Sequence, residues 1–91
     1  MQNPYLQIAR QFLRDHPQLF KESTPEVKEE MAGLIADQVL VQVRALTPAI
    51  AESQLTPQMT QEQIEGVTNM AKMRAEEVAY HEVMYAMLEP Y

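Results

Sequence analysis

The side chains best suited to chemistry lie near the C-terminus, where Glu76, Glu77, His81 and Glu82 fall within seven residues. Glu77 and His81 are four residues apart and would be neighbours on one helix face. A carboxylate and an imidazole placed in this way could hold a divalent ion if a symmetry-related chain supplied further ligands. The Glu-x-x-His motif of di-iron bundles is absent, because Val78 stands three residues before His81. We therefore expect a solvated pair, and a carboxylate/His metal- or ligand-binding bundle is kept as an alternative.

Nucleophiles are few, because the chain has no cysteine and its serines, Ser23 and Ser53, have no histidine near them in sequence. A serine triad needs a histidine base and an acid that orients it, and neither is visible here. His16 is expected to contact a helix end and solvent. Gly33 and Gly66 stand alone, so no glycine-rich phosphate loop exists. The sequence predicts no enzyme and no cofactor.

Composition points to one small acidic domain over residues 1–91. Thirteen acidic and seven basic residues give a formal charge of −6. This balance argues against binding to nucleic acids and to anionic membrane surfaces. We also expect no membrane-spanning helix, no signal peptide, a complete small protein and a cytoplasmic location. A folded monomer of this mass should bury about 64% of its unfolded surface.

The predicted fold class is all-α: a small bundle of three to four helices with a long C-terminal helix, completed by dimerisation. Helical periodicity predicts helices over 4–15, 25–46 and 60–88, while 47–59 is ambiguous between a short helix, a kinked continuation and a connection. The expected core of the first helix is Tyr5, Ile8, Ala9, Phe12 and Leu13. The expected core of the second is Val27, Met31, Leu34, Ile35, Val39, Val43 and Leu46. Leu40 and Val41 fall off this stripe, which suggests that the second helix is covered on more than one side.

The C-terminal helix should begin with a capping box formed by Thr60 and Gln63. Unbroken to Leu88, it would be about 42 Å long. A compact chain of this length is roughly 31 Å across. We expect either a bend at 66–69 or an overhang covered by another molecule.

Two apolar stripes run along this C-terminal helix. One contains alanines and branched residues: Ile64, Val67, Ala71, Ala75, Val78, Ala79 and Val83. The other has heptad spacing with a charge at its centre: Met70, Met73, Glu77, Tyr80, Met84, Met87 and Tyr91. Either the first two helices bury both stripes, or the methionine/tyrosine stripe meets a second chain. We favour the second chain, and a homodimer first, because two-fold dimers are the commonest assembly.

The function predicted is that of a small acidic helical protein–protein interaction module: an adaptor, assembly factor or regulator. It would act through the methionine/tyrosine stripe, with a homodimer as the first partner and another protein as a further one. The alternative is an acidic inhibitor that masks a basic nucleic-acid-binding surface of a partner protein. Two groups of acids could form its anionic faces: Glu22, Glu26, Glu29 and Glu30, and Glu76, Glu77 and Glu82.

Overall fold

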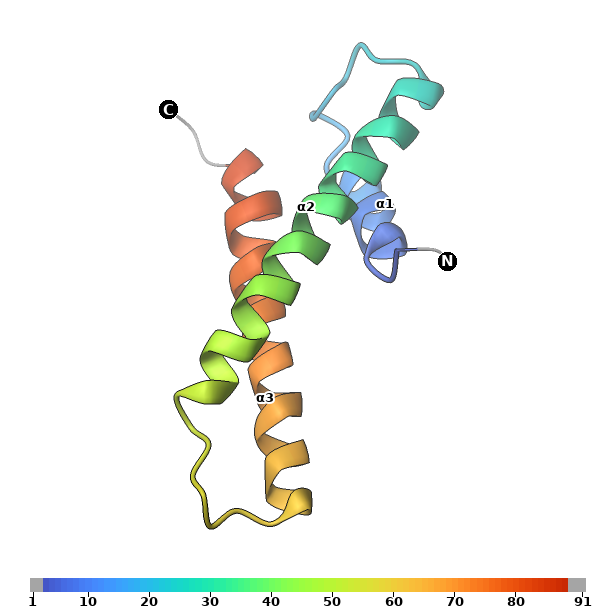
Figure 1. Ribbon diagram of the computed structural model, residues 1–91. Coiled ribbons are helices and arrows are strands. Elements are labelled where there is room, and N and C mark those ends of the chain that lie inside the picture. The colour runs from blue at the N-terminus through green and yellow to red at the C-terminus, as the bar shows by residue number, and fades with distance from the viewer. Residues whose placement is uncertain (1–2, 89–91) are drawn as a thin grey trace.

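A computed structural model describes residues 3–88 and is all-α over that range (Figure 1). Its helices are α1 (Leu6–Asp15), α2 (Pro25–Glu52) and α3 (Gln61–Ala79). The chain continues from α3 into a five-residue π-helix, Tyr80–Met84, and a short 3-10 helix, Tyr85–Leu88. We refer to residues 80–88 as the C-terminal turns. The all-α class is confirmed, with three helices in the described part.

Side-chain caps begin the two long helices where the sequence predicts them. The hydroxyl of Thr24 accepts a hydrogen bond from the backbone N–H of Val27 at 3.2 Å, and Pro25 follows as the first helical residue. At α3, the Gln63 N–H donates to the Thr60 hydroxyl at 3.2 Å, and the Thr60 N–H donates to the Gln63 side chain at 2.9 Å. These bonds satisfy backbone N–H groups that have no partner inside a helix.

The segment after Leu46, which the sequence leaves ambiguous, continues α2 to Glu52 through Pro48. Proline lacks the N–H that would otherwise bond the carbonyl four residues earlier. Directly before it in the chain, the Thr47 hydroxyl donates to the carbonyl oxygen of Val43 at 2.7 Å. Residues 53–60 form the connection to α3.

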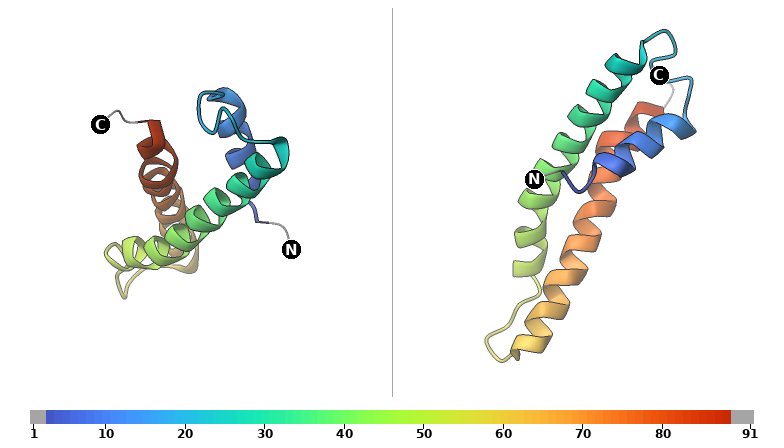
Figure 2. Two further views of the ribbon diagram at one scale, coloured as in Figure 1. Left: turned by 90° about the horizontal axis from the view of Figure 1, so that it is seen from above. Right: turned by 90° about the vertical axis from the view of Figure 1, so that its right-hand side faces the viewer.

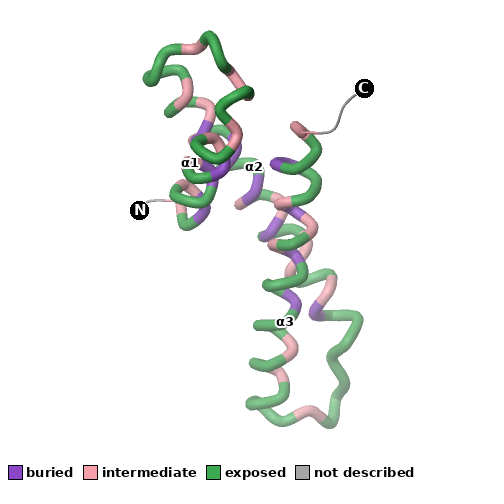
Figure 3. The backbone as a smooth tube through the Cα atoms, turned by 180° about the vertical axis from the view of Figure 1, so that it is seen from behind, coloured by how far each residue is buried: buried purple, intermediate pink, exposed green. Residues whose placement is uncertain are grey.

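The helices form two layers, with α2 alone in one and both α1 and α3 in the other (Figure 2). α1 packs beside the N-terminal half of α2, and the Arg10 guanidinium there forms an ion pair with Glu29. α3 runs along the rest of α2, and its C-terminal turns reach α1. Buried residues gather where these surfaces meet (Figure 3). The core cluster consists of Tyr5, Ala9, Phe12, Ala32, Ile35, Ala36, Val39, Val43, Ala75, Ala79, Val83 and Met84.

Part of the predicted core is wrong. Ile8, Val27 and Leu34 are exposed, whereas Ala32 and Ala36 are almost fully buried. Val27 and Leu34 are exposed because both partners of α2 lie on one side of it (Figure 2). Leu40, which falls off the predicted stripe, packs against the core, whereas Val41 beside it is 67% exposed.

The molecule is open and elongated rather than compact. Its Cα radius of gyration is 16.1 Å and its extents are 55 × 34 × 17 Å, whereas a compact chain of this length would have a radius near 12 Å. It exposes 6771 Å², about 1,300 Å² more than a typical monomer of its mass. The fraction of surface buried on folding is about 56%, below the predicted share.

The C-terminal helix does not break near Gly66, where the sequence shows its weakest helix formers. α3 is a regular helix through 66–69, and the Thr68 hydroxyl donates to the carbonyl oxygen of Ile64 at 2.9 Å. The change in winding comes instead at Tyr80–Met84. A π turn holds more residues than an α turn, so it shifts the side chains that follow it around the helix axis.

One sequence-based exclusion needs correction. α2 is long and apolar enough, by length and composition, to cross a membrane. The core helix of a soluble protein can pass the same test, but only 28% of the apolar stretch of α2 is buried within the structure.

Candidate interaction surface

The predicted methionine/tyrosine stripe is divided between the core and the surface. Met84 is 3% exposed and belongs to the core, and Tyr80 and Met87 pack against it. Met70 and Met73 are 68% and 63% exposed, and Glu77 is exposed beside them. Tyr91, the last member, lies outside the described residues. The exposed apolar part of the stripe is therefore the pair Met70 and Met73, which we call the methionine pair.

The buried half of the stripe joins the C-terminal turns to α1. The rings of Tyr5 and Tyr80 meet edge to face with centroids 6.2 Å apart, and those of Phe12 and Tyr85 meet in the same way. Each such pair adds stability beyond the area it buries. Because Met84 is enclosed within one chain, it is not a contact for a second molecule in this arrangement.

Glu76 has a structural partner across these elements. The Tyr5 hydroxyl donates a hydrogen bond to Glu76 Oε2 at 2.8 Å. Burial, together with this bond to a carboxylate, raises the pKa of Tyr5 well above its ordinary range. The pKa of Tyr80 is raised as well, by burial and by the nearby charge of Glu76. Glu76 thus holds α3 to α1.

The other residues of the predicted metal candidate are all exposed: Glu77, His81 and Glu82. His81 and Glu82 lie in the π-helix. Across residues 3–88, no group of three or more His, Asp or Glu side chains could hold a metal ion.

The remaining candidate side chains bond to helix ends. The Ser53 hydroxyl donates to the carbonyl oxygen of Ile50 at 2.7 Å. His16 Nδ1 lies 2.9 Å from the carbonyl oxygen of Phe12, and the two rings stack at a tilt. Ser23 is part of the turn before α2, where its N–H donates to the carbonyl oxygen of Phe20. None of these residues has a catalytic partner within the described chain.

The predicted anionic face on the first turns of α2 is partly neutralised. Glu29 pairs with Arg10, and this hydrogen bond lowers the pKa of Glu29. Glu22, Glu26 and Glu30 are exposed. With Glu76 bonded to Tyr5, each of the two predicted acidic groups has one member engaged inside the chain.

The structure reveals an apolar surface that the sequence analysis assigns to the core or leaves unassigned. Val27, Leu34 and Val41 are spaced seven residues apart on α2 and are all exposed, and we call them the α2 outer face. Figure 2 shows that the other helices lie on one side of α2. Leu34 is 56% and Val41 67% exposed. A shallow groove follows this face between Leu34 and Val41, lined also by Asp37, Gln38 and Gln42. The seven-residue spacing is the signal that could have identified it.

A second hollow adjoins the methionine pair. It lies between the 53–60 connection and the first turns of α3, and its apolar lining comes from Met59, Val67 and Met70. Apolar residues are thus exposed on both layers of the molecule, over α2 and over α3.

Comparisons with models of known protein families, with curated proteins and with solved structures found no match. The functional reading therefore depends on the surfaces described above.

Proposed function

We propose that this chain is a small acidic helical protein–protein interaction module that acts in the cytoplasm by docking helix against helix, and that its first partner is a second copy of itself. Binding, rather than catalysis, is the role that these surfaces support. The single observation that carries the proposal is the excess of about 1,300 Å² of exposed surface over a typical monomer. A stable interface takes about 800 Å² from each partner, so the excess is large enough for one.

The exposed side chains suit this use. Leu34, Val41, Met70 and Met73 are each more than half exposed. Large apolar patches on a small soluble protein mark places where another molecule binds. The methionine pair provides a flexible, polarisable surface of the kind found where varied partners dock.

The deciding experiment is light scattering coupled to size exclusion over a hundredfold range of concentration. We expect a mass near twice 10.5 kDa at the upper end of the range. A mass of one chain at every concentration would overturn self-association.

The methionine pair is proposed as the surface for a further protein partner. Met70→Glu and Met73→Glu together should abolish capture of that partner, because they place charge on an apolar contact. Lys72→Glu is the matched control, because Lys72 lies between them in sequence but on another side of α3, beside Tyr5 and Arg44. It should leave capture intact. An equal loss of capture in both variants would show that the added negative charge, rather than the loss of the methionine pair, prevents binding.

A further inference from the structure

The α2 outer face has the pattern of a surface that binds its own copy. Its two most exposed residues are Leu34 and Val41. Asp37 and Gln38 lie midway between them in the groove. Two-fold pairing requires that a surface complement itself when turned end for end.

The apolar pair meets this requirement. If two α2 helices lie antiparallel with their crossing point at Asp37 and Gln38, Leu34 of one chain lies opposite Val41 of the other, and the reverse contact follows by symmetry. The two side chains are about 10.5 Å apart along the helix. Each therefore covers the other's exposed surface without a change in the monomer.

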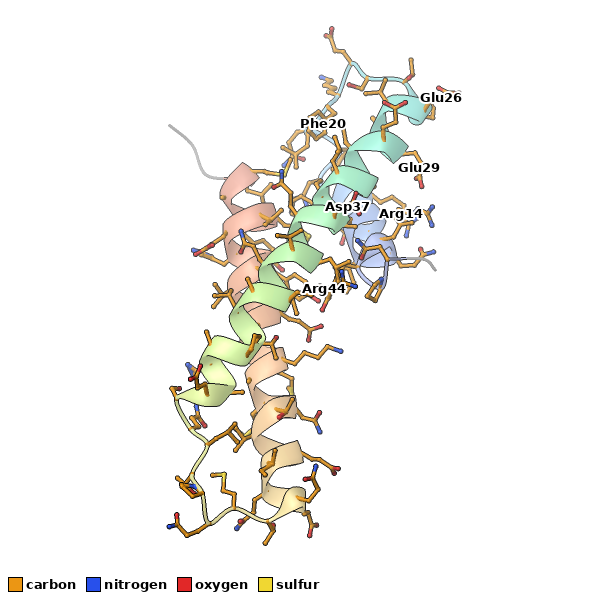
Figure 4. All side chains as sticks on the ribbon, viewed as in Figure 1. Arg14, Phe20, Glu26, Glu29, Asp37 and Arg44 are labelled. Carbon is orange, nitrogen blue, oxygen red and sulfur yellow. The ribbon has the colours of Figure 1, made fainter. Side chains whose placement is uncertain are left out.

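The charges on this side of α2 also satisfy the requirement of two-fold self-complementarity. Glu30 and Arg44 stand on the same side of α2, seven residues before and seven residues after Asp37. An antiparallel pair with the same crossing point brings Glu30 of one chain beside Arg44 of the other, twice. Within residues 3–88 neither side chain has an ion pair. Figure 4 shows Arg44 and Asp37 on the same stretch of α2.

The centre of the crossing is polar. Asp37 and Gln38 are consecutive and lie about 100° apart around the helix, so the two-fold axis brings each of them beside its own copy. Asp37 already accepts a hydrogen bond from the Asn3 side chain at 3.1 Å, which draws it toward the start of α1. This bond offsets part of the charge that the two Asp37 carboxylates bring together.

We infer that two copies of this chain dimerise through antiparallel packing of the α2 outer face, with Leu34 against Val41 and Glu30 against Arg44 of the opposite chain. The inference rests on the proposed self-association and names the surface that carries it. It moves the dimer contact from the predicted methionine/tyrosine stripe to α2. The methionine pair then remains free in the dimer.

The first test is Leu34→Glu, compared with Met70→Glu as the matched variant on α3. Both side chains are more than half exposed, so both variants should fold, which circular dichroism checks. We expect Leu34→Glu to weaken dimerisation at least about a hundredfold and Met70→Glu to change it little. The opposite pattern would overturn the α2 interface while leaving the proposed function standing.

The second test uses charge exchange. Glu30→Arg and Arg44→Glu should each weaken self-association by about tenfold, because each brings like charges together twice. Mixed in equal amounts, the two variants should form a heterodimer, since each new charge then meets its opposite. Native mass spectrometry counts the mixed species, and Glu65→Arg on α3 is the control for charge alone. Weakening in each single variant together with recovery in the mixture indicates antiparallel pairing, because parallel pairing would already place like charges together in the wild type. Single variants that associate as well as the wild type, or a mixture that does not recover, would overturn the assigned geometry.

The apolar length of α2 defines a competing outcome. Wild-type chain that stays monomeric in solution but sediments with phosphatidylcholine vesicles would show that lipid, rather than a second copy, covers the α2 outer face. That result would overturn the inference and the proposed self-association together.

Discussion

The hydrogen bond from the Tyr5 hydroxyl to Glu76 ties together residues 71 positions apart in the chain. Tyr5 is 4% exposed, so its ring stays packed when the hydroxyl is removed. We expect Tyr5→Phe to lower the free energy of unfolding by about 1.5–3 kcal/mol, the usual value of a hydrogen bond to a charged group. Urea denaturation measures the change. Tyr85→Phe, at an exposed ring, is the control, and its free energy of unfolding should stay within about 0.5 kcal/mol of the wild-type value.

The raised pKa of Tyr5 predicts a loss of stability in alkali. In the unfolded chain a tyrosine releases its proton near pH 10, whereas the folded protein keeps the Tyr5 proton to higher pH. Stability is therefore complete below pH 10 and falls as the pH rises above it. Tyr80 contributes in the same direction. Unfolding curves from pH 9 to 11 should show a shallower decline in Tyr5→Phe than in the wild type, and parallel declines would contradict the assignment.

At the scale of the helices, Pro48 is the clearest source of instability. It occupies an exposed position inside α2 and leaves one backbone carbonyl without its helical bond. We expect Pro48→Ala to raise the free energy of unfolding by about 1–3 kcal/mol, less a few tenths for the greater freedom of the unfolded chain. Pro25→Ala is the matched control because Pro25 is at the first helical position, where no bond is lost. Thermal denaturation of both variants measures the change in stability. A Pro48→Ala variant less stable than the wild type would show that the proline stabilises α2.

Local signals predicted the helices better than they predicted what the helices pack against. The caps at Thr24 and Thr60 depend on neighbouring residues, so sequence alone located both helix starts. The placement of Leu34 and Met84 depends on which side of a helix its partners occupy, and periodicity gives a stripe without naming its partner. Leu34 was expected inside and is exposed, while Met84, expected at an interface with another chain, lies in the core.

The π-helix at Tyr80–Met84 was also beyond the sequence pattern. A strict α-helical count continues the methionine/tyrosine stripe straight through these residues. The extra residue in the turn instead accompanies the docking of the C-terminal turns on α1, through the pairs Tyr5–Tyr80 and Phe12–Tyr85. Such tertiary contacts lie outside what spacing along one helix can encode.

For the molecule as a whole, the open two-layer shape is the property most readily measured in solution. Leu34→Glu, expected to be monomeric, should give a radius of gyration near 16 Å by small-angle X-ray scattering, matching the described chain. The wild-type dimer should be thicker along the shortest molecular axis, because the α2 outer faces meet across it. A radius near 12 Å for the variant would indicate a compact fold and contradict the open arrangement.

The packing of both other helices against α2 also affects how the protein opens. α1 is ten residues long, against 28 for α2 and 19 for α3, so it has the least surface to bury against its neighbours. Amide protons of α1 should accordingly exchange with solvent faster than those in the middle of α2, through an opening that leaves the α2–α3 hairpin in place. Hydrogen exchange would then resolve two cooperative units in a chain of 91 residues. The first helix would detach at low free energy, while α2 and α3 would stay packed together.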